Sequence, residues 1–227
     1  MNQDTRHFTE ELAELKQRLL AMGGLAEERL ESAVRAMVER DRALMAAVIN
    51  GDEAINRLQV EIDDRCFKLL ALRQPMAVDL RVIVAAFKIN SDLERIGDLA
   101  VNVAEAAERY VSHPPVKPLI DLPRMADMAQ RMLREALHAF VAGNAEAAQS
   151  VLEQDDGLDA LKNQIFRELL TYMLGDPRTI EPGLDLILVS RHLERVGDHA
   201  TNIAEDVIFI VEARDVRHHG TDRPTDR

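Results

Sequence analysis

Apolar residues recur every three or four positions along most of this chain, which is the spacing of amphipathic α-helices. The first long helical segment is predicted at about residues 9–50, with a bend or interruption at Gly23-Gly24. A second helix is predicted at about residues 52–72 and a third at about residues 78–110. A proline lies between these two helices and separates them, because it cannot continue the hydrogen bonds of a helix.

The same plan returns after a proline-rich stretch at residues 112–118, which cannot be helical and is predicted to be a linker. A fourth helix is predicted at about residues 122–143, and a continuation as far as residue 152 stays open. The last two helices are predicted at about residues 155–174 and 179–213, on either side of a Gly-Asp-Pro sequence that ends helices.

The predicted fold is all-α, with two tandem three-helix bundles of antiparallel, up-and-down helices that are related by an internal repeat. Residues 9–111 form the first repeat and residues 121–213 the second, and residues 112–120 link them. Residues 1–8 are predicted to be a flexible N-terminus, and the polar residues 214–227 a disordered C-terminal tail.

The strongest sign of the repeat is the match between residues 93–105 and residues 193–205. Nine of the thirteen positions are identical, including glycine and charged positions, and two others exchange Ile and Val. The first two helices of the repeats align with a shift of 103 residues, and the third helices with a shift of 100. The shift changes between the second and third helices, where a loop tolerates insertions.

Each repeat places two carboxylates and an asparagine at positions i, i+4 and i+8 of its third helix, which predicts one shared face. These residues are Glu94, Asp98 and Asn102 in the first repeat and Glu194, Asp198 and Asn202 in the second. Carboxylates one turn apart repel each other, and a bound cation would offset that repulsion. Gly97 and Gly197 cost about 1 kcal/mol each within a helix, which indicates close approach by another helix or a ligand.

The second helix of each repeat is predicted to bring further oxygen ligands to the same height, because it runs antiparallel to the third across a short turn. The matching residues, counted from Pro75 and Pro177, are Asp52 and Asn56 in the first repeat and Asp155 and Asp159 in the second. Converging carboxylates suit Fe, Mn, Mg or Ca better than Zn, and several of them could hold more than one ion. Because Asn56 carries no charge, the second site is the one expected to fill if only one does.

Simpler interpretations of these residues stay open. The acidic positions could be a solvated helix face, and Asn102 and Asn202 could be buried residues that bond to a neighbouring helix. His199 stands where the first repeat has Leu99 and is interpreted as a local difference rather than a ligand. Cys66 lies on an apolar helix face and is predicted to be part of the core.

Composition narrows the functional classes. A net charge of −12 argues against a general nucleic-acid binder, which needs clustered Lys and Arg. The single cysteine allows no internal disulfide and fits a reducing compartment. Nothing resembles a signal peptide, and no apolar run approaches the roughly 18 residues that span a bilayer. A cytoplasmic protein without membrane insertion is therefore expected.

Residues 93–98 (Leu-Glu-Arg-Ile-Gly-Asp) and 193–198 (Leu-Glu-Arg-Val-Gly-Asp) resemble the PhoU family of phosphate-transport regulators, and the resemblance extends over residues 10–213. It implies two three-helix bundles in one chain, with divalent or trivalent metal ions, iron or zinc, bound in multinuclear clusters. The ligand motifs that it implies are Glu94 with Asp98, Asp155 with Asp159, and Glu194 with Asp198. Asp52, Asn102 and Asn202 are further candidates.

The resemblance also implies a non-enzymatic negative regulator of phosphate uptake and phosphate-starvation signalling. Its implied partners are the ATPase subunit of the phosphate ABC transporter and a phosphate-sensing histidine kinase. A homodimer is expected because long helices often leave an apolar stripe. Two alternatives stay open. One is a ferritin-like di-iron carboxylate oxidase, for which Glu135 and His138 form a lone Glu-x-x-His motif, and the other is a helical scaffold without metal.

Overall fold

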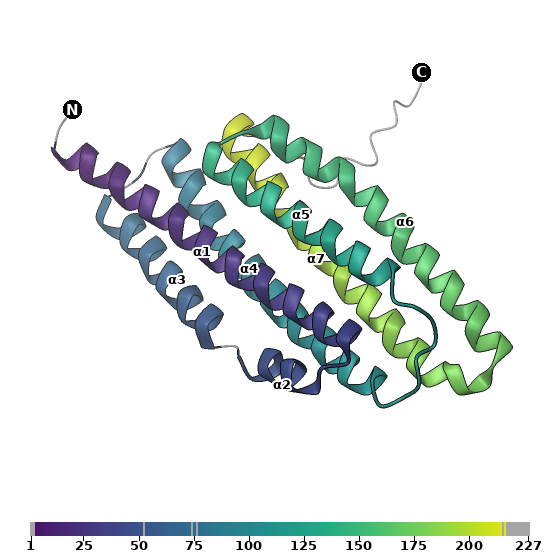
Figure 1. Ribbon diagram of the computed structural model, residues 1–227. Helices are drawn as coiled ribbons and strands as arrows, with labels where there is room; N and C mark the ends of the chain where they lie inside the picture. Colours follow the sequence, from purple (N-terminus) through teal and green to yellow (C-terminus); the bar gives the residue numbers. More distant parts are fainter. Residues whose placement is uncertain (1–2, 52, 74, 76, 215, 217–227) are drawn as a thin grey trace, which may run out of the picture.

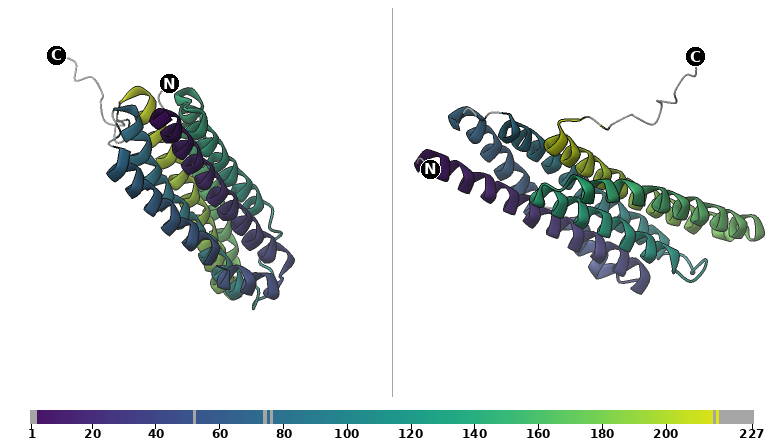
Figure 2. Two further views of the ribbon diagram at one scale, coloured as in Figure 1. Left: turned by 90° about the vertical axis from the view of Figure 1, so that its left-hand side faces the viewer. Right: turned by 90° about the horizontal axis from the view of Figure 1, so that it is seen from above.

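The computed structural model describes residues 3–51, 53–73, 75, 77–214 and 216, and within them the prediction of an all-α fold is confirmed. The helices are α1 (Gln3–Glu39), α2 (Arg42–Asn50), α3 (Glu53–Arg73), α4 (Val78–Tyr110), α5 (Asp121–Ala142), α6 (Ala145–Gly175), the short η1 (Pro177–Thr179) and α7 (Ile180–Glu212). Figure 1 shows α3 and α6 at opposite edges of the molecule, with the other long helices between them. All of the long helices run roughly along one axis, so the molecule is elongated (Figure 2).

The core forms because each long helix turns its apolar stripe inward. On α1, buried residues recur every three or four positions, at Leu15, Leu19, Met22, Ala26, Leu30, Ala33 and Met37. Burial of each large aliphatic side chain contributes about 1.5–3 kcal/mol as an upper estimate. The first repeat consists of α1 to α4 and the second of α5 to α7, as the sequence alignment predicts.

The two repeats meet along α4 and α7, which pack antiparallel to each other. Several polar contacts cross between the helices, among them Lys88 with Asp206 at 2.7 Å, Asp92 with His199 at 2.8 Å, and Arg109 with Asp185 at 2.9 Å. Asp185 and Asp206 are both buried, so each requires the cation that faces it. The pairs therefore specify the register in which α4 and α7 meet.

The prediction of a bend or interruption at Gly23-Gly24 is wrong, because α1 runs unbroken through both residues. Gly23 is buried where α1 crosses α5, and a Cβ atom there would lie 2.2 Å from Cδ1 of Leu137. Gly24 is exposed and faces open space. Gly23 therefore serves close packing between the two repeats.

The first helical segment does not run unbroken to residue 50 as predicted, because α1 ends at Glu39. Arg40 has a left-handed backbone with φ of 58°, and its guanidinium donates to the carbonyl oxygens of Val111 and His113. The side chain of Asp41 then caps α2 by accepting hydrogen bonds from the amides of residues 43 and 44. The long-range contacts of Arg40 stabilise a backbone conformation that arginine rarely adopts.

The second repeat has the same break 103 residues later, at Gly143 and Asn144. Gly143 is left-handed with φ of 62°, and the Asn144 side chain accepts from the amide of Ala147. The continuation of the fourth helix to residue 152 is therefore wrong, and so is a start of the next helix at residue 155. The single helix α6 begins at Ala145 and runs through both positions.

In the first repeat, the segment that corresponds to α6 is divided into α2 and α3 around Gly51. The buried Arg29 donates from Nε and Nη2 to the carbonyl oxygen of Val48, at 3.2 and 2.7 Å. In a continuous helix that oxygen would accept from the backbone four residues on. The aligned residue of the second repeat is Met132, which has no donor, and α6 stays continuous there.

The ends of the chain differ in part from the predictions. Helix α1 begins at Gln3, so residues 3–8 are helical rather than a flexible N-terminus. The stretch between α4 and α5 has no helix, as expected for the linker, and Lys117 ties it to Asp121 and Glu168. The predicted tail lies outside the described residues apart from residues 214 and 216.

The adjacent glycines of α1 provide a test of this packing. Gly24→Ala is predicted to stabilise the fold by about 0.5–1 kcal/mol, because alanine favours a helix and Gly24 faces open space. Gly23→Ala is predicted to be about 1–3 kcal/mol less stable than Gly24→Ala, because its methyl group collides with Leu137. Urea unfolding of both variants measures the difference. An equal gain in the two variants would contradict the close contact between α1 and α5.

Candidate functional site

Four carboxylates of the second repeat lie together where α6 and α7 face each other. Asp155 and Asp159 come from α6, and Glu194 and Asp198 come from α7. Desolvation and repulsion among these acids raise the pKa of Asp155, and the same two causes raise the pKa of Asp198. The number of residues that separates each acid from the turn at Pro177 therefore correctly predicts that these four residues lie together. We call them the acidic cluster.

Gly197 allows the two helices to approach closely enough to form this cluster. A Cβ atom on Gly197 would lie 2.3 Å from Cδ2 of Leu158 and 3.7 Å from Oδ1 of Asp155. In the first repeat a Cβ atom on Gly97 would lie 2.9 Å from Cδ1 of Ile55, which aligns with Leu158. Both glycines thus serve helix packing, which is one of the two alternatives that the sequence leaves open, and Gly197 also lies beside a carboxylate of the cluster.

Lys162 is a member of this site that the sequence analysis missed. Its Nζ atom donates to Oδ1 of Asp159 at 3.0 Å and to Oε1 of Glu194 at 2.7 Å, so one ammonium group bridges α6 and α7. These two partners raise the pKa of Lys162 against the opposing effect of desolvation, so the ammonium stays charged. The aligned residue of the first repeat is Gln59, a difference that a comparison of the repeats would have found.

The first repeat is built differently at the aligned positions. Glu94 and Asp98 share Arg95, whose guanidinium lies 3.7 Å from Oε2 of Glu94 and 3.4 Å from Oδ2 of Asp98. Asn56 is exposed on α3 next to the buried Ile55. Asp52 lies outside the described residues. The described part of this site therefore has fewer carboxylates than the acidic cluster of the second repeat.

The two asparagine candidates differ in where they lie. Asn202 donates to Oδ1 of Asp92 on α4 at 3.4 Å, beside the bond between Asp92 and His199. Positions i, i+4 and i+8 turn by about 80° in all around a helix, which directs Asn202 away from α6. Asn102 is half-buried on α4. Asn202 thus belongs to the contact between the two repeats, and so does His199, which the sequence interprets as a local difference.

The chemistry of the acidic cluster fits a hard cation, because its donors are carboxylate oxygens. Among the described residues, no three His, Cys, Asp or Glu side chains are already arranged to hold a metal ion. In the cluster, Lys162 lies where it neutralises two of the four carboxylates. Metal binding by these residues stays a prediction, and it requires Lys162 to move.

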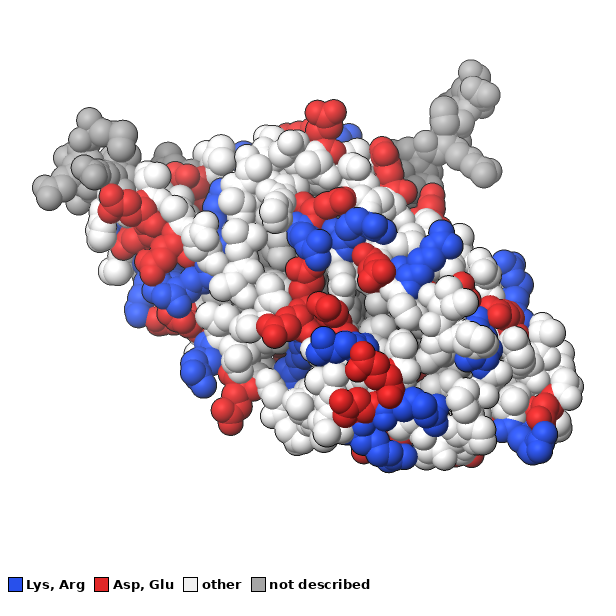
Figure 3. All heavy atoms as spheres, viewed as in Figure 1, with Lys and Arg blue, Asp and Glu red and all other residues white. Residues whose placement is uncertain are grey.

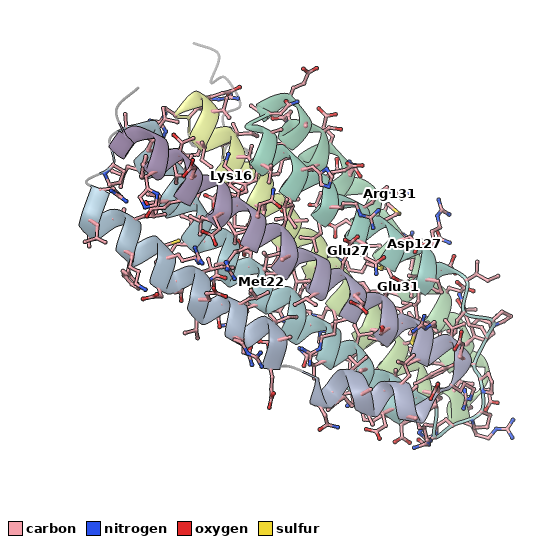
Figure 4. All side chains as sticks on the ribbon, turned by 60° about the vertical axis from the view of Figure 1, so that its left-hand side comes forward. Lys16, Met22, Glu27, Glu31, Asp127 and Arg131 are labelled. Carbon is pink, nitrogen blue, oxygen red and sulfur yellow. The ribbon has the colours of Figure 1, made fainter. Side chains whose placement is uncertain are left out.

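The face formed by α1 and α5 carries charges of both signs, interspersed as Figure 3 shows. Glu27 of α1 forms an ion pair with Arg134 of α5, and Glu31, Asp127 and Arg131 lie on the same two helices (Figure 4). On this face Glu27 therefore has a basic partner, unlike the crowded carboxylates of the acidic cluster. In the described part of the chain, no helix has the length and hydropathy of a membrane span.

Comparison with known proteins gives consistent matches over most of the chain. The family model described as PhoU domain matches twice, at residues 19–107 and 122–207. A PhoU homolog of Caulobacter vibrioides, named as a phosphate-specific transport system accessory protein, is 45% identical over 205 residues, 90% of this chain and 89% of the relative. A Pseudomonas putida protein of the same name is 42% identical over 97% of this chain and 87% of its own length.

Two crystal structures match the fold. PhoU from Pseudomonas aeruginosa gives a TM-score of 0.86 at 41% identity, covering 91% of this chain and all of the other. The phosphate transport system regulatory protein PhoU from Streptococcus pneumoniae gives a TM-score of 0.84 at 30% identity, covering 92% of this chain and 99% of the other. The double match to the family model also confirms the internal repeat.

Replacing Asp198 by asparagine is predicted to stabilise the metal-free protein at neutral pH. The pKa of Asp198 is raised by desolvation and by Glu194, Asp155 and Asp159, so the folded state keeps this proton to higher pH than the unfolded chain. The ionised carboxylate therefore lowers stability as pH rises above the ordinary value of 3.8, and below it the cost disappears. Thermal unfolding in chelator should show a gain for Asp198→Asn that grows with pH.

Asp98→Asn is the matched control from the first repeat. Its carboxylate lies near the Arg95 guanidinium, so its removal loses an attraction and should give no gain at neutral pH. A stabilisation of the same size in both variants, or none in Asp198→Asn at any pH, would contradict the crowding of charge in the second repeat.

Proposed function

The chain belongs to the PhoU family, and from that premise we propose that it is an accessory protein of a phosphate-specific transport system. The observation that carries this proposal is the match along nearly the whole length of relatives that bear this name. Because each chain covers about nine-tenths of the other, the similarity includes both repeats rather than one helical segment. In this role the protein restrains phosphate uptake and acts without catalysing a reaction, at the cytoplasmic face of the transporter.

The second part of the proposal is a metal site in the second repeat. Asp155, Asp159, Glu194 and Asp198 would hold a divalent or trivalent cation, with the site of the first repeat as a weaker counterpart. What supports it is the crowding of four carboxylates against a single ammonium group, which a cation of higher charge would relieve. The bound ion would supply positive charge that joins α6 to α7. Iron fits this all-oxygen donor set better than zinc does, because the cluster has no His or Cys.

The third part concerns protein partners. Both repeats expose apolar side chains at aligned positions of their third helices, and these are Leu80 and Val84 on α4 and Ile180 and Leu184 on α7. Exposed apolar surface of this kind is typical of a face that other proteins cover. We assign it to the ATPase subunit of the transporter and to a phosphate-sensing histidine kinase, and a second copy of the chain in a homodimer would cover it in the same way.

A di-iron oxidase of the ferritin type has less support. Such a site needs its Glu-x-x-His ligands to project into the centre of the bundle. Glu135 and His138 are both exposed on α5, and Glu135 accepts a hydrogen bond from Gln154 at 2.6 Å. This motif therefore lies on the outer surface of α5.

Metal analysis tests the site directly. In protein purified without chelator, Glu194→Ala/Asp198→Ala is predicted to lose most of the bound metal, because each substitution removes a carboxylate ligand. Glu94→Ala/Asp98→Ala serves as the aligned control and should retain the larger part. Elemental analysis by mass spectrometry gives the number of ions per chain. Less than one ion per wild-type chain, unchanged in the first double variant, would refute the metal site.

Capture of the transporter ATPase tests the accessory role. The tagged protein is predicted to retain this ATPase from a lysate of its source cells, and Leu184→Ser/Leu188→Ser should weaken the complex about tenfold or more. Two exposed leucines together contribute about 2 kcal/mol or more when a partner buries them. Ile120→Ser, an exposed residue next to α5, is the control. Consistent failure of the wild-type chain to capture either the ATPase or the kinase would count against the proposal.

A further inference from the structure

A cleft of about 210 Å³ lies between α6 and α7, directly beside the acidic cluster. Residues of α6 and α7 line it in nearly equal number, and they are Lys162, Asn163 and Phe166 on α6 and Ile187, Ser190, Arg191 and Glu194 on α7. Lys162 and Glu194 belong both to this cleft and to the acidic cluster. The ion pair between Lys162 and Glu194 therefore separates the cleft from the rest of the acidic cluster.

Two cationic side chains line the cleft, and they differ in their ion pairs. The Lys162 ammonium is bound to Asp159 and Glu194, so it is directed toward the acidic cluster. Arg191 is exposed, and its guanidinium takes part in none of the ion pairs found in the described part of the chain. A planar guanidinium with parallel donors matches the oxygens of a phosphate group, and an ammonium adds a point charge.

At the aligned place in the first repeat an asparagine side chain bridges the two helices, and an acidic residue stands where the second repeat has Phe166. There Asn90 on α4 donates from Nδ2 to the carbonyl oxygen of Gln59 at 2.9 Å and to Oδ1 of Asp63 at 2.8 Å, both on α3. In the second repeat Ser190 replaces Asn90 and bonds back to the carbonyl oxygen of Ile187 at 2.8 Å. The shorter side chain does not span the gap, so the space remains open.

Three differences between aligned residues each make this place more positive in the second repeat than in the first. Lys162 and Arg191 replace Gln59 and Ser91, which brings two positive charges to the second repeat. Phe166 replaces Asp63, which removes a negative charge from the same place. An open cleft and a cationic lining thus occur together in the repeat that carries the acidic cluster.

We propose that this cleft is a binding site for a dianionic phosphate group, held by Arg191, Lys162 and the amide of Asn163, and that it fills when a cation at the acidic cluster releases Lys162. The inference rests on the metal site proposed above. Without the cation, four carboxylates outweigh the two cationic groups, so a dianion is repelled. A divalent cation that neutralises Asp159 and Glu194 frees the ammonium, and the two remaining carboxylates then balance rather than outweigh the two cationic groups.

The coupling between the two ligands is reciprocal. If the cation raises the affinity for phosphate by some factor, phosphate raises the affinity for the cation by the same factor. A coupling of about tenfold to a hundredfold lies within the usual range between neighbouring sites. The protein would then hold metal and phosphate together, in its second repeat only.

Calorimetric titration of the full chain tests this inference, with Mn²⁺ as the probe cation. Inorganic phosphate is expected to bind saturably to protein loaded with Mn²⁺, and at least about tenfold more weakly to protein in chelator. Phosphoserine in a parallel titration distinguishes a free phosphate ion from a phosphorylated partner, and chloride at equal ionic strength is the blank. Millimolar phosphate and phosphoserine that both fail to bind the Mn²⁺-loaded protein would overturn the site.

Two variants separate the cleft from general electrostatics. Arg191→Gln is expected to weaken phosphate binding about tenfold or more while Mn²⁺ affinity without phosphate stays unchanged. Arg195→Gln removes the same charge one turn further along α7, outside the lining, and should have little effect on phosphate. Equal losses in both variants, or none in Arg191→Gln, would contradict the assignment.

Lys162→Gln, which copies the first repeat, tests the coupling. The variant is expected to bind Mn²⁺ more tightly in the absence of phosphate, since the competing ammonium is gone, and to lose most of the effect of phosphate on Mn²⁺ affinity. Weaker Mn²⁺ binding in this variant would overturn the role of Lys162. Absence of Mn²⁺ binding to the wild-type chain would instead refute the metal site itself, whereas Mn²⁺ binding without phosphate binding refutes only the cleft.

Discussion

The close contact between the second and third helices of each repeat is the constraint on which the site depends. Ile55 packs over Gly97 in the first repeat, and Leu158 packs over Gly197 in the second. Because a side chain in place of either glycine would push the helices apart, the glycine allows their close approach. In the second repeat this close approach brings the carboxylates of α6 near those of α7.

The two repeats share a framework but differ in the polar residues that it presents. Glu94 and Asp98 have the neighbouring Arg95 of their own helix as their cation, whereas Lys162 of α6 pairs both with Asp159 on its own helix and with Glu194 on α7. Among the described residues Arg95 pairs only with acids of its own helix and adds no ion pair between helices, but the Lys162 ammonium joins α6 to α7. The two repeats thus share one arrangement of their second and third helices. Differences in side chains leave the second repeat with more carboxylates among the described residues and with the open cleft.

Much of the fold follows from local features of the sequence. The period of the apolar residues predicts the long helices, the prolines predict the ends of the second helix in each repeat, and the alignment of the repeats predicts which acids meet. The break at Gly51 agrees with the predicted end of the first segment at about residue 50 and the predicted start of the second helix at about residue 52. The break before α2 could not be predicted in this way, because it depends on Arg40, whose guanidinium bonds to backbone carbonyls far away in the sequence. The direction of the Asn202 side chain away from α6 could have been predicted, since it follows from the helical period alone.

The sequence by itself determined that the chain is helical, that it is duplicated and that its acids recur in register, because period, proline and repeat are properties of the residue order. Only the tertiary structure decided which side chain neutralises those acids and where space remains beside them. The sequence alone does not show that Lys162 faces the acids rather than solvent. Nor does it show that Asn90 spans the gap between two helices, so that its replacement by Ser190 in the second repeat leaves a cleft. Charge pairing and cavities depend on distances between helices, and the residue order does not contain those distances.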